Sequence, residues 1–216
     1  MRVNIWTTLL NALFPRRCIL CRNESDTSVC EACYAGLAPE RPHPSPWITS
    51  AVSYEDKQVQ KLVRHLKTYP DAELAMQIAH SMRDVVIEQC SDTMTMHGLT
   101  RAILVPIPIH QSRFTERGYN QALLIARELE KLLDRVPVVE LLKKIRKTDK
   151  QALIHARGIR LQNPKGCFQA LPVRAQNDTL IILIDDVATT GATLAEAKRT
   201  LKVAGWHHII ACTFAH

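Results

Sequence analysis

The distribution of apolar and polar residues predicts strands and helices that alternate over most of the chain. Four segments have the pattern of strands, one alternating and three mainly apolar: residues 48–54, 102–105, 180–184 and 209–214. Four others carry apolar residues at helical spacing: 59–66, 72–89, 120–133 and 193–204. Strands separated by helices favour an α/β fold with a mostly parallel sheet flanked by helices.

The first 45 residues have a different pattern. Ile5, Leu9 and Leu13 fall at helical spacing before Pro15, which predicts a short amphipathic helix that packs on its own protein rather than on a membrane or partner. Residues 38–47 contain four prolines, typical of an extended linker. We therefore expect two domains, 1–45 and 46–216. No segment approaches the roughly 18 uncharged apolar residues of a membrane span, and no secretory cleavage site is recognisable, which favours a cytoplasmic protein.

Four of the seven cysteines are regularly spaced. Cys18 and Cys21 form one C-x2-C pair, Cys30 and Cys33 form a second, and eight residues separate the pairs. Two such pairs provide the tetrahedral thiolate shell that Zn²⁺ prefers. Disulfides are the alternative, but a reducing compartment favours metal binding. Because four protein ligands leave no open position, we expect a structural zinc knuckle whose fold depends on the ion.

The charge of the chain is concentrated in one window. The net charge is +7, and residues 141–165 contain eight lysines and arginines against Asp149. This window predicts an anionic partner such as a polyphosphate or nucleic acid, although a charge run is also typical of a plain solvated face. The candidate contacts within it are Lys143, Lys144, Arg146, Lys147, Lys150 and Arg157.

The stretch LIILIDDVATTGATL at 180–194 combines acids with a phosphate-binding pattern. Asp185 and Asp186 follow an apolar strand, and Gly191 precedes a helix whose first N–H groups suit a phosphate. A Walker B strand would need a GxxxxGK[ST] loop, which the chain lacks, and a DxDxT phosphatase would need its second acid one position later. Acids that accept hydrogen bonds from vicinal hydroxyls beside a phosphate indicate a ribose 5-phosphate. A capping box of Thr193 with Glu196 is the structural alternative.

The same stretch closely resembles the phosphoribosyl pyrophosphate (PRPP) motif of type I phosphoribosyltransferases. Together with the cysteines, VPIPIHQSRFTERGYNQA and QALIHARGIRLQNPKGCF, the chain resembles the ComF family of competence proteins over nearly its whole length. The resemblance implies that Asp185 and Asp186 hold the ribose hydroxyls, that Arg113 and Arg117 face the pyrophosphate, and that the basic window forms a hood. It assigns the 5-phosphate to Ala188, Thr189, Thr190, Gly191, Ala192 and Thr193.

Several functions are compatible with this resemblance. It implies PRPP bound with Mg²⁺, and the handling of incoming single-stranded DNA on the cytoplasmic side during natural transformation, near a helicase partner. A nucleobase phosphoribosyltransferase of salvage metabolism would share the PRPP site but needs a base pocket and turnover. A regulatory module, in which PRPP changes the affinity for DNA or a partner, is the third possibility. If the protein is an enzyme, we expect glycosyl transfer from PRPP.

Overall fold

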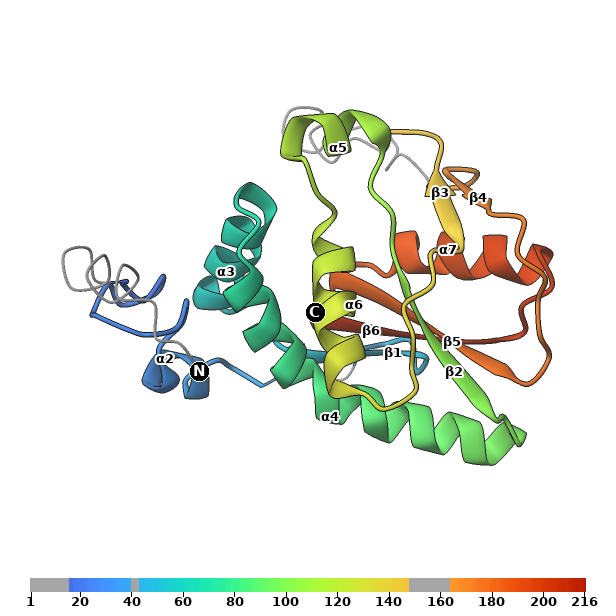
Figure 1. Ribbon diagram of the computed structural model, residues 1–216, viewed down its shortest axis with the longest axis horizontal. Helices are drawn as coiled ribbons and strands as arrows, with labels where there is room; N and C mark the ends of the chain where they lie inside the picture. The colour runs from blue at the N-terminus through green and yellow to red at the C-terminus, as the bar shows by residue number, and fades with distance from the viewer. Residues whose placement is uncertain (1–15, 40–42, 148–163) are drawn as a thin grey trace, which may run out of the picture.

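The computed structural model describes residues 16–39, 43–147 and 164–216 (Figure 1). The helix expected before Pro15 lies outside the described residues, as do Lys150 and Arg157 of the basic window. None of the described helices combines the length and the hydropathy needed to cross a bilayer.

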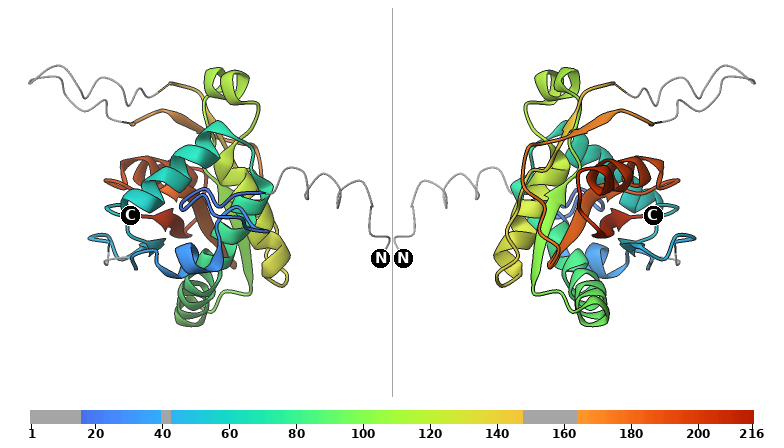
Figure 2. Two further views of the ribbon diagram at one scale, coloured as in Figure 1. Left: turned by 90° about the vertical axis from the view of Figure 1, so that its left-hand side faces the viewer. Right: turned by 90° about the vertical axis from the view of Figure 1, so that its right-hand side faces the viewer.

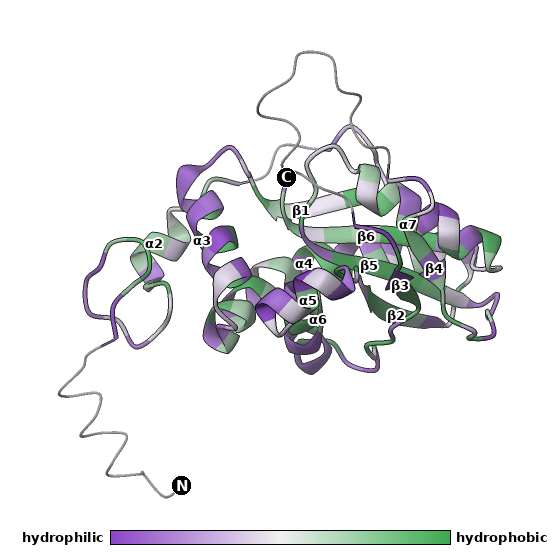
Figure 3. Cartoon of the chain, turned by 90° about the horizontal axis from the view of Figure 1, so that it is seen from above, coloured by the Kyte–Doolittle hydropathy of each residue, from purple (hydrophilic) through white to green (hydrophobic). Residues whose placement is uncertain are grey.

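A four-stranded parallel sheet forms the centre of the molecule, which confirms the predicted fold class. Its order is β1 (Ile48–Val52), β6 (His208–Ala215), β5 (Thr179–Val187) and β2 (Arg101–Pro106). The central strand β5 pairs with both β6 and β2, and its residues from Thr179 to Ile184 are almost completely buried. Continuous burial explains the apolar run in the sequence, because both faces of a parallel sheet are covered. β2 and β5 are accordingly hydrophobic over most of their length (Figure 3).

Helices cover the two faces of the sheet. α4 (Ala72–His97) and α6 (Gln121–Leu132) lie on one face, and α7 (Ala192–Val203) lies on the other (Figures 1 and 2). Side chains of β5 alternate between the two cores: Ile182 and Ile184 pack with α4 and α6, whereas Ile181 and Leu183 pack with α7. α3 (Lys57–Thr68) joins the first core through its stripe of four buried apolar residues.

Several elements differ in extent from the sequence prediction. α4 continues well past its predicted end at residue 89. Its last residue is His97, and Gly98, with a φ of 62°, ends the helix. β5 continues through both aspartates, because Asp185 pairs with Thr213 and Val187 with Ala215. Four short elements were not predicted, because they are too short to show a period: α2 (Glu31–Ala35), α5 (Gln111–Arg117), β3 (Leu142–Lys144) and β4 (Phe168–Ala170). β3 and β4 form an antiparallel pair; β3 lies within the first described part of the basic window, and β4 follows its second described part.

The N-terminal module packs directly on α3 and α4. It contains α2 (Glu31–Ala35), and its Val29 is fully buried in the same core as these two helices. The Val29 N–H donates to Oε1 of Gln77 on α4 at 2.9 Å, and Nε2 of Gln77 donates back to the Val29 carbonyl at 2.7 Å. Lys61 of α3 donates to the Leu20 carbonyl at 3.3 Å. The module and the larger domain therefore share one hydrophobic core.

Candidate functional site

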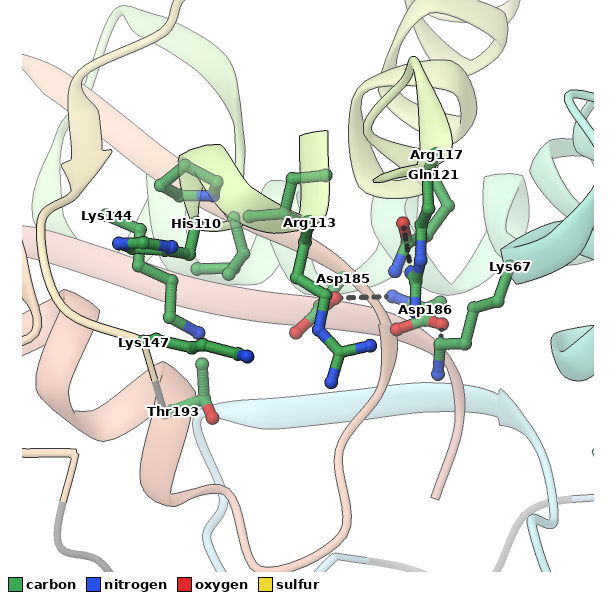
Figure 4. A pocket seen from close by; sticks show the side chains of 13 residues that line it. Lys67, His110, Arg113, Arg117, Gln121, Lys144, Lys147, Asp185, Asp186 and Thr193 are labelled. Atoms are coloured by element: carbon green, nitrogen blue, oxygen red, sulfur yellow. Dashed lines mark hydrogen bonds and ion pairs between the residues drawn. The ribbon is translucent and has the colours of Figure 1, made fainter. Parts of the chain in front are cut away.

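A cavity of about 200 Å³ lies at the carboxyl ends of β2 and β5, where parallel sheets commonly bind ligands (Figure 4). Basic side chains reach it from three directions: from α3, from the α5–α6 region, and from β3 with the residues after it. Its lining contains Lys67, Ile107, Pro108, Ile109, His110, Arg113, Arg117, Gln121, Lys144, Lys147, Asp185, Asp186 and Thr193. The structure thus brings together both predicted acids, both predicted arginines, two lysines of the basic window and one threonine of the loop.

The two aspartates belong to opposite faces of β5 and still meet at the cavity. Asp186 follows the face of α4 and α6, and Asp185 follows the face of α7, because successive side chains alternate along a strand. The Asp186 N–H donates to Oδ1 of Asp185 at 2.9 Å. Burial, followed by the charge of Asp186, raises the pKa of Asp185 to about 8. The pair therefore holds less than two full negative charges at neutral pH.

Lys67, a residue that the sequence prediction missed, neutralises the more buried acid. Its Nζ lies 2.6 Å from Oδ2 of Asp186, which is only 5% exposed. Burial would lower the pKa of Lys67, but the attraction of Asp186 outweighs burial, and the pKa is raised. A signal was present in the sequence, because Lys67 follows Val63 by four residues and so continues the buried stripe of α3.

The turn between α5 and α6 positions Arg113 and Arg117. Gly118 ends α5 with a φ of 80°, and Asn120 caps α6 by accepting from the Ala122 N–H at 3.1 Å. Nδ2 of Asn120 also donates to the Ile107 carbonyl at 3.0 Å, which fixes the start of α6 against the segment after β2.

Gln121 was not predicted as a site residue. Its Oε1 accepts from Nη1 of Arg117 at 3.2 Å, so it orients that guanidinium. Gln121 lies four residues before Ile125, on the buried face of α6. A polar residue on an apolar stripe was again the signal that could have identified it.

The basic window contributes only in part to the cavity. Lys144 and Lys147 line it, whereas Lys143 and Arg146 do not. Arg146 instead donates through Nη2 to the Lys165 carbonyl across the β3–β4 pair. Lys144 also lies over the ring of Phe168, with Nζ 5.5 Å from the ring centroid. The described window therefore has lysines that face the cavity and basic residues that point elsewhere.

The N-cap residue of α7 provides no side-chain cap, and the Ala192 N–H makes only a long hydrogen bond to Oγ1 of Thr190, at 3.4 Å. Gly191 is its N-cap, with a φ of 68°, and Thr193 lines the cavity. Ala188, Thr189, Thr190, Gly191 and Ala192 do not line it, and the Ala188 N–H already donates to Ala215 at 2.9 Å. The suggested capping box is wrong, because the helix begins at Ala192 and Glu196 accepts from the Gly166 N–H at 2.6 Å instead. In contrast, α3, α4, α5 and α6 are capped by side chains.

The four predicted zinc ligands converge in the N-terminal module. The Sγ atoms of Cys18, Cys21, Cys30 and Cys33 all lie within 4.8 Å of one another. The Cys21 and Cys30 Sγ atoms are 3.8 Å apart, which is the edge expected of a tetrahedron with Zn–S bonds of about 2.3 Å.

The thiols of this cluster differ in acidity. Burial opposes ionisation of Cys18, but N–H donors outweigh it and lower its pKa to about 6. Hydrogen bonding with Cys30, with burial, raises the pKa of Cys33 to about 12. A divalent cation would stabilise all four thiolates, so this donor set fits one structural Zn²⁺.

Comparison with known proteins agrees with these features. Residues 9–45 match the double zinc ribbon domain model. The chain is 34% identical over 107 residues to competence protein F of Haemophilus influenzae, covering 49% of this chain and 46% of that protein. It is 27% identical over 198 residues to the DNA utilization protein YhgH of Escherichia coli K12, covering 85% and 83%. The Salmonella typhi protein of the same name is 28% identical over 162 residues.

The match spans about half the length of competence protein F, but most of YhgH. Residues 9–45 contain four cysteines, which is the complement for one tetrahedral ion. Together with the order of the motifs along the chain, these similarities support its place in the ComF family, with a zinc module at the N-terminal end.

Proposed function

We propose that this chain takes part in the uptake or use of DNA and binds PRPP with Mg²⁺ at the carboxyl ends of β2 and β5. The names of the relatives, competence protein F and DNA utilization protein, support the first part. One observation carries the second part: two aspartates and five lysines and arginines line a single cavity next to a helix that has no side-chain cap.

The arrangement suits a phosphorylated pentose. N–H groups in the first turn of α7 lack acceptors within their helix and would bind the 5-phosphate with the Thr193 hydroxyl. Asp185 and Asp186 would accept hydrogen bonds from the ribose hydroxyls. Arg113 and Arg117 would bind the pyrophosphate, because guanidinium groups pair well with phosphate oxygens.

Charge and size favour a small polyanion. Five cationic side chains against two carboxylates give the cavity an excess of positive charge, and the raised pKa of Asp185 increases this excess at neutral pH. The volume of about 200 Å³ is smaller than the roughly 300–1,000 Å³ of sites that enclose drug-sized ligands. Among the described residues, the cavity therefore supports a sugar phosphate better than a sugar phosphate together with a nucleobase.

The residues present also fit Mg²⁺. Magnesium prefers oxygen ligands and is usually held by one or two carboxylates together with substrate phosphates. Asp185 is partly exposed and lines the cavity, so its carboxylate could take this part, while Lys67 holds Asp186. The ion would neutralise charge on the pyrophosphate.

Calorimetric titration with PRPP and Mg²⁺ tests the ligand. We expect binding by the wild-type protein and a loss of at least about tenfold in affinity for Asp185→Asn combined with Thr193→Ala, because each removes a direct contact of about 1.4 kcal/mol or more. Arg83→Ala, an exposed change on α4, should bind as the wild type does. Absence of heat with folded wild-type protein would contradict PRPP binding.

The nucleobase phosphoribosyltransferase alternative makes a further demand on the same site. Release of pyrophosphate from PRPP in the presence of Mg²⁺ and one base of a panel would favour that function. If the protein binds PRPP but no base of the panel stimulates the release of pyrophosphate, a binding role would be favoured.

Single-stranded DNA would contact the basic residues that do not line the cavity. Lys143→Glu with Arg146→Glu should reduce the slope of log K against log salt by about 0.7 for each phosphate that the variant no longer neutralises. Arg83→Glu is the matched charge reversal away from this surface. Titration of a labelled oligodeoxythymidine at several salt concentrations measures the slope. An unchanged slope would remove these two residues from the DNA contact, whatever the result with PRPP.

A further inference from the structure

A second and larger cavity lies at the other end of the sheet. Its volume is about 620 Å³, within the range of roughly 300–1,000 Å³ found for ligand sites. It lies where β2 and β5 begin, beside the end of α4, whereas the aspartates lie where β5 ends (Figure 1). We call it the β2 groove; its lining comprises Cys90, Met94, residues 100–103, 134–137, 139, 141, 173, 174, 176 and 179, and Trp206.

The floor of the β2 groove is apolar. Leu141 and Trp206, 1% and 4% exposed, are part of the core beneath α7, and Ile103 and Val139 pack against that core while remaining partly exposed. Val173 at the rim is 44% exposed. Apolar area of this kind favours a ligand that has an aliphatic or aromatic side chain.

Three arginines surround this floor. Arg101, Arg135 and Arg174 line the groove together with one carboxylate, Asp134. Arg135 and Asp134 are more than 90% exposed and 3.6 Å apart, so water screens their attraction. Arg101 donates to Gln176 at 2.8 Å, and its Nε lies 3.8 Å from Asp178. The rim therefore carries a positive charge that complements an acidic ligand.

The edge of β2 is incompletely paired inside this groove. On its outer side the Leu104 N–H donates to the Pro137 carbonyl, and the Leu104 carbonyl accepts from the Val139 N–H, both at 2.9 Å. Ala102, two residues earlier, points its N–H and carbonyl to the same side. Continuation of the parallel ladder would require the N–H of residue 137, but proline has none.

Arg135, two residues before Pro137, has a φ of 58°, which is unfavourable for a residue other than glycine. The chain therefore turns at this point and does not continue alongside β2. Within the described parts of the chain, no backbone hydrogen bond reaches Ala102 on this outer side. The groove thus offers a strand edge, an apolar floor and a basic rim in one place.

We propose that the β2 groove binds an extended acidic segment of a partner protein, which pairs with β2 at Ala102, places an apolar side chain against Ile103 and Val139, and places a carboxylate against Arg135 and Arg174. Addition of a strand to an exposed sheet edge is a common mode of peptide recognition, with backbone hydrogen bonds giving affinity and side-chain pockets giving specificity. A nucleic acid fits less well, because Trp206, the aromatic residue of the lining, is too buried to stack with a base.

Selection from a random displayed 12-residue peptide library on the full-length, zinc-loaded protein tests this proposal. We expect selected peptides that share an apolar residue next to an acidic one. Arg135→Glu with Arg174→Glu should weaken their binding at least tenfold, as should Val173→Asp, and Arg83→Glu should not. All these positions are exposed, so folding should be retained. Amide hydrogen exchange at Ala102 should slow when a selected peptide binds.

Three results would overturn the proposal. The first is a set of selected peptides that contains no acidic residues, or that binds the charge-reversed variant as well as the wild type. The second is unchanged exchange at Ala102 in a saturated complex. The third is that the same substitutions leave the binding of selected peptides unchanged but abolish the binding of an oligonucleotide. Loss of a concentration-dependent dimer of this chain, with unchanged peptide binding, would have the same meaning.

Discussion

At the scale of single residues, Lys67 explains how two adjacent carboxylates are tolerated at the end of a buried strand. An isolated buried carboxylate is costly, and a second one beside it increases the cost. The ammonium of Lys67 lies 2.6 Å from Asp186, and the raised pKa of Asp185, about 8, shows that the remaining cost falls on the second acid. In the site, Lys67 therefore neutralises Asp186, whereas Asp185 would gain full negative charge only with a bound cation or hydrogen-bond donor.

Loss of Lys67 should expose this dependence. Lys67→Met leaves Asp186 buried without its cation, and we expect the free energy of unfolding to fall by about 3 kcal/mol. Because the uncompensated charge is the cause, adding Asp186→Asn should restore most of the loss. Urea denaturation at pH 7.5 measures both effects.

Lys57→Met, an exposed change at the start of the same helix, is the control and should change the unfolding free energy by less than about 0.5 kcal/mol. A similarly small effect of Lys67→Met would show that the ion pair contributes nothing to stability.

At the scale of elements, the packing of the N-terminus of α7 depends on Gly191. Its φ of 68° favours glycine, and a Cβ there would lie 2.8 Å from Cδ1 of Ile48 in β1. The loop therefore lies close to the side chain of Ile48 in β1, with no room for a Cβ at residue 191 unless that side chain moves.

Gly191→Ala should destabilise the protein by more than the roughly 1 kcal/mol expected from the backbone conformation alone. Gly98→Ala is a matched control, because Gly98 has a φ of 62° and no atom within 4 Å of an added Cβ. Ile48→Val removes the clashing Cδ1, so it should be less harmful in the Gly191→Ala background than in the wild type. Thermal denaturation of the four variants measures this coupling, and additive effects would contradict the contact.

At the scale of the whole molecule, the zinc module is an integral part of the structure. Cys18 and Val29 belong to the hydrophobic core of α3 and α4, and Ser28 donates to Asp71, the residue that caps α4. α3 carries Lys67 into the candidate site, so the module supports a helix that the site requires. The predicted domain boundary near Ser45 stays a prediction. The hydrophobic core that contains Cys18 and Val29 includes residues on both sides of it.

Removal of zinc should therefore lower the melting temperature of the entire chain in a single transition. We expect one Zn²⁺ per chain by elemental analysis and a decrease of at least about 5 °C after chelation, because a loss of 1 kcal/mol shifts the midpoint by roughly 2–4 °C at this size. Cys33→Ser should have the same effect. Cys90→Ser, outside the cluster, should keep the metal. Removal of zinc without a change in melting temperature would show that the module folds independently.

Features that depend on neighbouring positions could be predicted from the sequence alone. The apolar run of β5, the stripe of α3 and the spacing of the four cysteines could all be recognised, because period and motif are properties of a contiguous chain. The ligand roles assigned to Asp185, Asp186 and the loop after them remain predictions.

Features that join distant positions emerged only from the folded molecule. Lys67 and Asp186 meet because α3 ends beside the carboxyl end of β5, and the ladder on β2 ends at Pro137, which accepts from the Leu104 N–H but has no N–H of its own to donate. Neither contact has a local pattern, because each joins segments that are far apart in the sequence. The division of the basic window into lysines that face the cavity and residues that do not has the same origin. The direction in which each basic side chain of the window points follows from the β3–β4 pairing, which joins residues about 25 positions apart in the chain.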